Sequence, residues 1–326
     1  MPDWHSFTFR RRAGPHSGLR QRRDTGVVNL SASRLGLLLD VDGPVASPVS
    51  RTVRPAIIRD LVSLAVAGWP VIFNTGRSDD FIRQQVMQPM IAAGLPEGVR
   101  VHAVCEKGAV WFSFDGTGPD QPQVDPELKV PGDYAETIRN LVDEKYSRTM
   151  FFDETKLAML SVEQHVHVDN ADYLSEQGLF DADALEQLGL AGLGGQRLDR
   201  TLPDAAGNVS FRIDPTIIST DIEAVGVGKD LGARRALAML EAEGTEVPRT
   251  WRTVGDSRTD YAMADELSRL GFEVAHVDVR PADGVPETDY PVLTAGSLIH
   301  DDAGALYFER WVAMAAGEAA DDAVVL

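Results

Sequence analysis

A short apolar run that ends in two carboxylates constrains the fold of this 326-residue chain more than any other feature. Residues 35–39 are apolar or glycine, Asp40 and Asp42 follow at once, and Gly43 comes next. A run this short and apolar is typical of a fully buried strand, and the glycine indicates a tight turn behind it. Because ligands bind beyond the carboxyl ends of strands in open α/β sheets, the two carboxylates are predicted to lie at a binding site.

Three later segments carry further polar groups at similar places. One is an apolar strand that ends in a hydroxyl and a glycine turn, one is a lysine ahead of a helix, and one supplies two carboxylates on a strand-to-helix turn. They are Val71 to Arg77 (VIFNTGR), Lys229, and Val254 to Asp260 (VGDSRTD). The order along the chain is therefore carboxylate pair, hydroxyl, lysine, carboxylate pair.

Strand and helix patterns alternate along the first part of the chain. Helical spacing of apolar residues covers 53–67 and 79–93, between short apolar runs at 71–74 and 101–104. The same alternation returns after residue 216. Alternation of this kind predicts an α/β fold in which a Rossmann-like parallel sheet has right-handed crossovers and helices on both faces.

The middle of the chain has a different character, which predicts an inserted α/β cap domain over 113–215. The catalytic core would then comprise 34–112 and 216–316. Residues 1–33 are basic and lack apolar periodicity, which predicts a disordered tail, and an arginine-rich transit peptide is the alternative. Residues 317–326 are predicted to form a small acidic tail.

Within the insert, four elements are predicted from the pattern of apolar residues. Helices are expected over 134–145 and 183–190, and strands over 157–167 and 209–213. Each is short enough to belong to a small domain.

Bulk properties exclude some classes of partner. The formal net charge of −19 would repel a nucleic-acid backbone, so we expect no nucleic-acid partner. Cys105 is the only cysteine, which excludes an intramolecular disulfide and favours a reducing compartment. No apolar stretch reaches the ~20 residues that a membrane span needs. We therefore predict a cytoplasmic protein that does not bind membranes.

Taken together, the four segments resemble the motifs of the haloacid dehalogenase-like hydrolase superfamily, most of whose members are Mg²⁺-dependent phosphatases. The matching pieces are LLLDVDG (37–43), VIFNTGR (71–77), Lys229 in GVGKD, and VGDSRTD (254–260). An insert between the hydroxyl motif and the lysine resembles the IIB subclass, which includes Cof-like and sugar-phosphatase-like proteins. The cap of that subclass is a small sheet with helices on one side.

The resemblance implies a catalytic role for four residues. Asp40 would be the nucleophile that forms an aspartyl-phosphate, and Asp42 would protonate the leaving oxygen and later activate water. Thr75, with the backbone amides beside it, would bind the transferring phosphoryl group. Lys229 would balance the carboxylates and stabilise the charge of the transition state.

The resemblance also implies a Mg²⁺ cofactor, since this ion prefers a few carboxylates together with water and phosphate oxygens. Its ligands would be Asp40, the backbone carbonyl of Asp42, and Asp256, with Asp260 as a ligand or close partner. Further candidates for substrate contact come from the phosphate-binding turn, the lysine motif and the end of the cap. These residues are Thr75, Gly76, Arg77, Lys229 and Arg212, and a surface arginine at a helix start is the alternative for Arg77.

Two departures from the family pattern bear on the substrate and on the cap. Lys107 stands where the segment leading into the cap more usually has asparagine. Thr259 precedes Asp260, and the resulting GDSRTD resembles the GDDRTD-like segment of trehalose-phosphate phosphatases. The expected function is therefore hydrolysis of a small phosphorylated metabolite, with a sugar phosphate as the expected class. A phosphosugar mutase and a non-catalytic phosphometabolite-binding protein are the alternatives.

Overall fold

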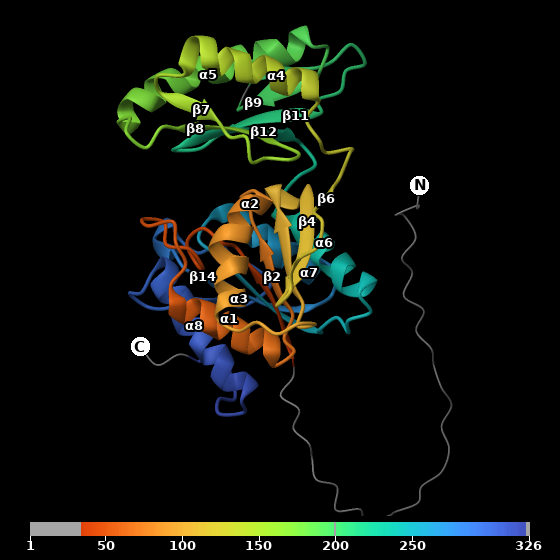
Figure 1. The fold of residues 1–326 in the computed structure, drawn as a ribbon, viewed down its shortest axis with the longest axis vertical. Coiled ribbons are helices and arrows are strands. Elements are labelled where there is room, and N and C mark those ends of the chain that lie inside the picture. Colours follow the sequence, from red (N-terminus) through yellow and green to blue (C-terminus); the bar gives the residue numbers. More distant parts are fainter. Residues whose placement is uncertain (1–33, 199, 324–326) are drawn as a thin grey trace, which may run out of the picture. The chain divides into compact units, whose positions relative to one another are not determined.

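The computed structural model describes residues 34–198 and 200–323, so the predictions made for residues 1–33 and 324–326 lie outside the described residues. The described part is an α/β structure with two sheets, one mostly parallel and one mostly antiparallel (Figure 1). The predicted fold class is confirmed.

The first sheet has its parallel strands at the centre. In space the strands follow the order β15-β14-β13-β1-β2-β3-β4-β5, with β6 also paired to β4. Strands β15 to β3 run parallel, whereas β4 is antiparallel to β3 and runs back from the carboxyl edge of the sheet. The strands are β1 (Leu35–Leu39), β2 (Val71–Asn74), β3 (Val101–Cys105), β4 (Val110–Asp115), β5 (Gly118–Pro119), β6 (Gln123–Val124), β13 (Thr250–Gly255), β14 (Glu273–Asp278) and β15 (Val292–Leu293).

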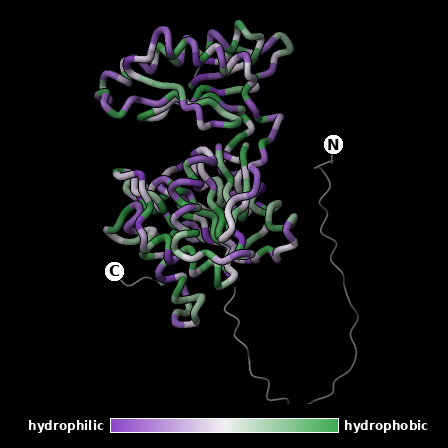
Figure 2. Tube along the Cα trace, in the orientation of Figure 1, coloured by the Kyte–Doolittle hydropathy of each residue, from purple (hydrophilic) through white to green (hydrophobic). Residues whose placement is uncertain are grey.

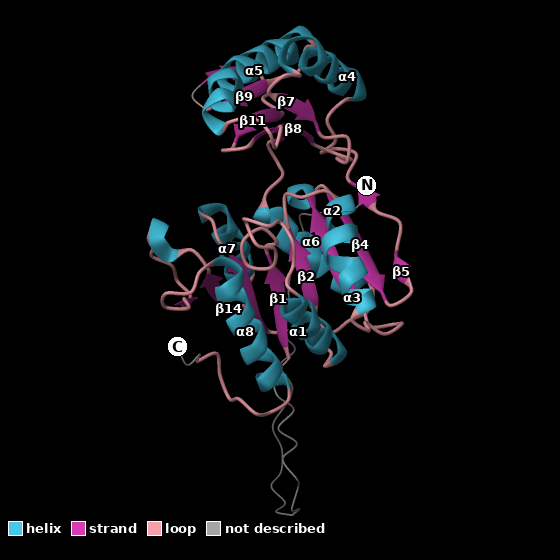
Figure 3. Ribbon diagram, turned by 60° about the vertical axis from the view of Figure 1, so that its left-hand side comes forward, coloured by secondary structure: helices cyan, strands magenta, loops and turns pink. Residues whose placement is uncertain are grey.

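Helices cover both faces of this sheet because its central strands are apolar on both sides. Leu37 and Leu39 of β1 pack into one apolar cluster with α1 and α8, while Leu38 packs into a second with α6 and α7. Figure 3 shows α1 and α8 together in front of the strands. The helical elements are α1 (Pro55–Val66), α2 (Asp79–Ile82), the π-turn η1 (Arg83–Met87), α3 (Gln88–Ala92), η2 (Glu106–Gly108), α6 (Lys229–Ala242), η4 (Arg258–Asp260), α7 (Tyr261–Arg269), η5 (Pro281–Asp283) and α8 (His300–Ala315).

The second sheet belongs to the insert and follows the order β10-β9-β11-β12-β8-β7. Its neighbours are antiparallel except for β9 and β11. Helices α4 and α5 lie against each other over one face of it (Figure 1). The elements are α4 (Gly132–Leu141), the π-turn η3 (Val142–Tyr146), β7 (Met150–Phe152), β8 (Leu160–Gln164), α5 (Asn170–Leu190), β9 (Gly195–Arg197), β10 (Arg200–Leu202), β11 (Phe211–Pro215) and β12 (Ser219–Ala224).

The insert was expected to span 113–215. The strand pairing places both changes from one sheet to the other at later residues than these limits. On the way out, β5 and β6 fold back onto β4 of the first sheet. On the way back, β12 pairs with β11 and β8 of the second sheet. The chain therefore leaves the first sheet after Val124 and leaves the second after Ala224.

The acidic end of the described chain lies against the first sheet and α8. Asp322 accepts hydrogen bonds from the indole Nε1 of Trp311 at 2.7 Å and from Nε of Arg252 at 3.0 Å. Hydrophobic residues concentrate along the strands and the inner sides of the helices (Figure 2). None of the helices that the structure describes is both long and apolar enough to span a membrane.

Candidate active site

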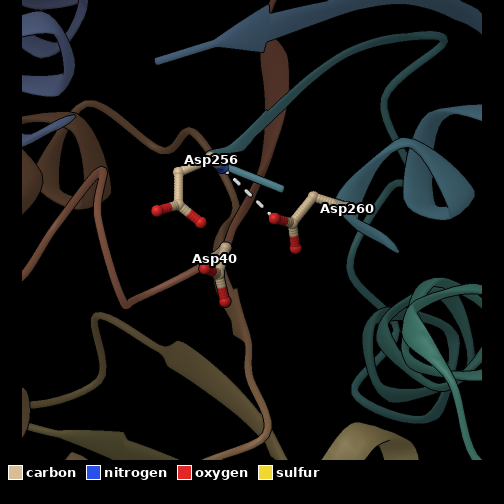
Figure 4. Close-up of side chains that lie close together, drawn as sticks. All are labelled: Asp40, Asp256 and Asp260. Atoms are coloured by element: carbon tan, nitrogen blue, oxygen red, sulfur yellow. Dashed lines mark hydrogen bonds between the residues drawn. The ribbon is translucent and has the colours of Figure 1, made fainter. Parts of the chain in front are cut away.

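Three aspartates meet at the carboxyl edge of the first sheet. Asp40 follows β1, Asp256 follows β13, and Asp260 ends the short turn η4. Because Leu39 of β1 lies opposite Val254 of β13, the two strands end at the same level. One carboxylate oxygen from each aspartate lies within 4.8 Å of the other two (Figure 4). The predicted convergence of the first and last motifs is therefore present.

The turn after β13 fixes the carboxylate of Asp260. Oδ2 accepts hydrogen bonds from the hydroxyl of Ser257 at 2.7 Å and from the backbone N–H groups of Ser257 and Asp256. Gly255 leaves room for this arrangement, since a Cβ there would lie 2.2 Å from the Cβ of Asp260. Gly43 is also required, because its φ is +95° and a Cβ would come within 2.7 Å of Asp256.

Lys229 begins α6 and places its ammonium between two of the aspartates. Nζ lies 2.5 Å from Oδ1 of Asp40 and 2.7 Å from Oδ1 of Asp260. It also donates to the backbone carbonyl of Asn74 at 2.7 Å. The side-chain amide of Asn74 donates in turn to the carbonyl of Lys229 at 2.9 Å, which fixes the start of α6 against the end of β2.

Burial and mutual repulsion shift the pKa values of these groups. Burial raises the pKa of Asp40, and it raises the pKa of Asp256 to about 6 with a further contribution from Asp260. Burial acts the same way on Asp260, yet the Lys229 ammonium holds the pKa of that carboxyl below its ordinary value. Although burial lowers the pKa of Lys229, Asp260 and Asp40 raise it above the usual range, so this lysine is a permanent cation.

The set of donors fits a hard divalent cation. Among the described residues, three carboxylates face a single close ammonium, so negative charge remains at the site. Apart from its contact with Lys229, Oδ1 of Asp260 is buried without a hydrogen-bond partner within the described part of the chain. Carboxylate oxygens are the ligands that such cations prefer. The buried acidic triad could therefore bind a metal ion.

Asp42 lies outside the triad and forms an ion pair with Arg77. The guanidinium donates from Nε to Oδ2 at 2.9 Å and from Nη2 to Oδ1 at 2.8 Å. The carboxylate of Asp42 remains 41% exposed, while Asp40 and Asp260 are buried. Arg77, which the sequence left between substrate contact and a surface position, is thus bound to the second carboxylate of the DxD pair.

Thr75 and Gly76 form the turn after β2. The backbone N–H of Thr75 donates to the carbonyl of Val104, so its hydroxyl is the group that remains able to donate to a ligand. That hydroxyl accepts a hydrogen bond from the N–H of Arg77 at 3.1 Å. The carbonyl of Gly76 accepts from Nζ of Lys156, a residue of the insert, at 2.8 Å.

Arg212 lies on β11 and is bound inside an ionic cluster. Its guanidinium donates to the buried carboxylate of Glu223 at 2.8 Å and to the carbonyl of Val227 at 3.0 Å. Lys107 of η2 reaches the same carboxylate at 2.8 Å and also contacts Asp214. The two cations therefore connect η2 of the first sheet's domain to strands of the insert.

A cavity of about 220 Å³ lies next to Arg77, between α2 and the strands β7 and β8 of the insert. Two phenylalanines and several amides and carboxylates line it, among them Phe81, Gln84, Phe151 and Glu163.

Several residues around the site were not among the predicted ones. Asn74 and Ser257 lie inside the quoted motifs, where their neighbours in the chain already mark the turn. Glu106 and His300 had no such signal, because their contacts involve segments far away in the sequence.

The comparisons with known proteins agree with this architecture. No family model and no curated protein matches the sequence. Among solved structures, a haloacid dehalogenase-like hydrolase from Bacteroides thetaiotaomicron matches with a TM-score of 0.53 at 11% identity, over 85% of this chain and 99% of that one. The chain has the haloacid dehalogenase-like fold.

Two further solved structures are similar to this chain. A protein of Thermoplasma acidophilum matches with a TM-score of 0.50 at 14% identity, over 86% of this chain and 99% of that one. Trehalose-6-phosphate phosphatase of Aspergillus fumigatus matches with a TM-score of 0.47 at 16% identity, over 88% and 93%. The match with a TM-score of 0.53 confirms for the fold the resemblance inferred from the four motifs, with the insert as the cap of a haloacid dehalogenase-like core.

Proposed function

We propose that the protein is a Mg²⁺-dependent phosphatase that hydrolyses a small phosphorylated metabolite through an aspartyl-phosphate. The observation that carries this proposal is the acidic triad of Asp40, Asp256 and Asp260, held around Lys229 in a haloacid dehalogenase-like fold. Phosphate monoesters resist attack because they are anionic. A site that combines a fixed carboxylate with a cation overcomes that repulsion.

The proposed reaction has two steps. In the first, an oxygen of Asp40 attacks phosphorus, and the bond from phosphorus to the leaving oxygen breaks as Asp42 gives that oxygen a proton. In the second, Asp42 takes a proton from a water molecule whose oxygen attacks phosphorus. Asp40 is then released as a carboxylate and inorganic phosphate leaves.

The neighbouring residues support these roles by their positions. Lys229 keeps Asp40 beside a fixed positive charge, and the hydroxyl of Thr75 is free to donate to a phosphoryl oxygen. Arg77 orients Asp42 at the edge of the site with two donors to its carboxylate, the form that takes the proton from water in the second step. Mg²⁺, held by Asp40, Asp256, the carbonyl of Asp42 and, directly or nearby, Asp260, would neutralise charge on the phosphoryl group.

We propose a sugar phosphate as the substrate. The cavity beside Arg77 offers hydrogen-bonding groups such as Gln84 and Glu163 together with the faces of Phe81 and Phe151. Such a lining suits a group that is polar at its edges and less polar on its faces. The resemblance of GDSRTD to the segment of trehalose-phosphate phosphatases supports the same class.

The experiment that tests this proposal is phosphate release from a panel of sugar phosphates and one aryl phosphate, with Mg²⁺ or with EDTA. The wild type is compared with Asp40→Asn and with Asp60→Asn, a control on α1 outside the site. Release that needs Mg²⁺ and is lost only in Asp40→Asn is the expected result. Transfer to a sugar instead of water would indicate a mutase, and Mg²⁺-dependent thermal stabilisation without release from any ester would indicate a binding protein.

A further inference from the structure

His300, at the start of α8, lies beside the acidic triad. Its Nδ1 is 3.6 Å from Oδ2 of Asp256, and both side chains are 20% exposed. Nδ1 itself is buried and has no hydrogen-bond partner within residues 34–198 and 200–323. Burying a ring nitrogen without a hydrogen-bond partner costs free energy, so a hydrogen-bond partner for Nδ1 is expected nearby. Asp256 is the carboxylate in reach.

The backbone conformation of His300 and the packing of α8 place this side chain beside the site. The residue has φ of +52°, in the left-handed region that is uncommon for residues other than glycine and in which asparagine, aspartate and histidine are over-represented. Its N–H donates to the carbonyl of Val279 at 2.8 Å. Gly304 lies one turn further along α8. A Cβ on Gly304 would lie 2.0 Å from the carbonyl oxygen of Pro44. The start of α8 is therefore packed against the loop that follows Asp42.

Apart from His300, the carboxylate of Asp256 has fewer polar contacts with the described residues than those of Asp40 and Asp260. Asp40 and Asp260 are both paired with Lys229. In the described part of the chain, no hydrogen bond reaches the carboxylate of Asp256, and His300 is the one basic side chain within ion-pair distance of it. The other close neighbour is Gly43, whose missing side chain leaves the carboxylate room to turn.

We propose that His300 is a positioning residue of the metal centre, which donates from Nδ1–H to Asp256 and fixes the orientation of that carboxylate for a divalent cation. The present separation exceeds a hydrogen bond by about half an ångström, which a small rotation of either side chain removes. Partners that orient a metal ligand in this way change metal affinity by about 10- to 100-fold when removed. The inference rests on the proposed function only through the metal site.

The test is the dissociation constant of Mg²⁺ for the full chain, measured by isothermal titration calorimetry in the absence of substrate. His300→Gly and His300→Asn form a matched pair, because both residues accept a positive φ but only asparagine keeps a donor near the position of Nδ1. Asp302→Ala is the control for the start of α8, since Asp302 pairs with Arg54 and does not touch the triad.

His300→Gly is expected to weaken Mg²⁺ binding by about 10- to 100-fold, while His300→Asn and Asp302→Ala stay within about threefold of the wild type. Equal affinity in His300→Gly and the wild type overturns the inference and leaves the phosphatase proposal standing. Equal weakening in His300→Gly and His300→Asn also overturns the inference, because a donor near the position of Nδ1 would then not restore Mg²⁺ binding. A wild type that binds no Mg²⁺ overturns both proposals.

Discussion

Lys229 is the residue on which the charge balance of the site depends. Its ammonium contacts Asp40 and Asp260, both of which are buried, and it is fixed in place by the carbonyl of Asn74. Without it, two carboxylates would remain in a poorly hydrated site with no other close cation among residues 34–198 and 200–323. In the sequence, Lys229 is one residue at the start of a helix. In the structure, it is the ionic partner of residues that follow two different strands.

Replacing Lys229 with methionine keeps most of the side-chain volume and removes the charge. We expect Lys229→Met to lower turnover by about 10²-fold or more, because the transition state loses a fixed positive charge. Stability should fall by about 3–5 kcal/mol, the usual cost of breaking a buried pair from one side. Phosphate release and urea unfolding measure the two effects, with the half-exposed Lys145→Met as the control. Unchanged turnover would contradict the role given to Lys229.

His276 gives the stability of the core a predictable dependence on pH. The ring is buried on β14, Nδ1 is 2.8 Å from the hydroxyl of Thr253, and burial lowers the pKa of the imidazole to about 4. Between the ordinary value of about 6.5 and this value, the unfolded chain binds a proton that the folded chain does not. The contribution of His276 is therefore complete above pH 6.5, decreases progressively between pH 6.5 and 4, and is lost below pH 4.

We expect the free energy of unfolding to fall by about 1.4 kcal/mol per pH unit on account of this residue, about 3 kcal/mol over the whole window. His276→Asn keeps a group that can bond to Thr253 and should flatten the profile between pH 6.5 and 4. Urea unfolding at several pH values measures the slope. The exposed His167→Asn is the control, and equal slopes in all three proteins would show that His276 is not the titrating group.

The residues that could be predicted from the sequence are those that the fold brings together by a general rule. Parallel strands end at one edge, so Asp40, Thr75 and Asp256 could be expected to converge from their positions alone. The contact of His300 with Asp256 could not, because the start of α8 lies beside the site only after the whole sheet has formed. The pairing of Asp42 with Arg77 depends on side-chain directions that periodicity does not reveal.

Among the elements, the loop between β7 and β8 shows why some boundaries differed from expectation. A strand was predicted over 157–167, whereas β8 spans Leu160–Gln164. The backbone N–H groups of residues 157–159 instead donate to the buried carboxylate of Glu106 in η2, at 2.8 to 2.9 Å. One carboxylate of the core thus takes three donors that a strand would have used in its ladder.

Three helices also differ from the sequence prediction in their bounds or in their presence. The helix predicted over 183–190 is the last part of α5, which begins at Asn170. Asp169 is the N-cap residue of this helix. The helix predicted over 79–93 is interrupted by the π-turn η1 and continues as α3, with a proline in its first turn. Helix α8 was not predicted, although its buried residues recur at helical spacing; they are Ala303, Gly304, Tyr307, Phe308 and Trp311.

Glu106 should hold the loop of the cap against the core. We expect Glu106→Gln to destabilise the protein by about 1–3 kcal/mol or more, because a side-chain NH₂ would face backbone donors and leave at least one of them without an acceptor. Hydrogen exchange of residues 157–159 should become faster than in the wild type. Glu154→Gln, whose carboxylate is exposed and pairs with Arg139, is the control. Unchanged exchange in Glu106→Gln would show that the loop is held by other contacts, such as that of Lys156 with Gly76.

At the scale of the whole molecule, the cap divides the residues of the site into two groups along the chain. Asp40 and Thr75 precede it, whereas Lys229, Asp256 and Asp260 follow it. The two groups meet because β1 is the neighbour of both β2 and β13. The site therefore exists only when the two halves of the core sheet are paired, and a cation bound by the triad would connect the halves directly.

This arrangement predicts that Mg²⁺ stabilises the core and leaves the cap unchanged. At a concentration 100 times its dissociation constant, the ion should add about 2.7 kcal/mol, which slows exchange about 100-fold for amides that open only with the core. Mass-spectrometric hydrogen exchange should show this protection in β1 and β13, with little change in β7 to β12, whose sheet shares no strand with the core. Asp256→Asn should lose the effect. Equal protection in both sheets would mean that the cap opens only together with the core, and no protection in either would contradict a metal site in the triad.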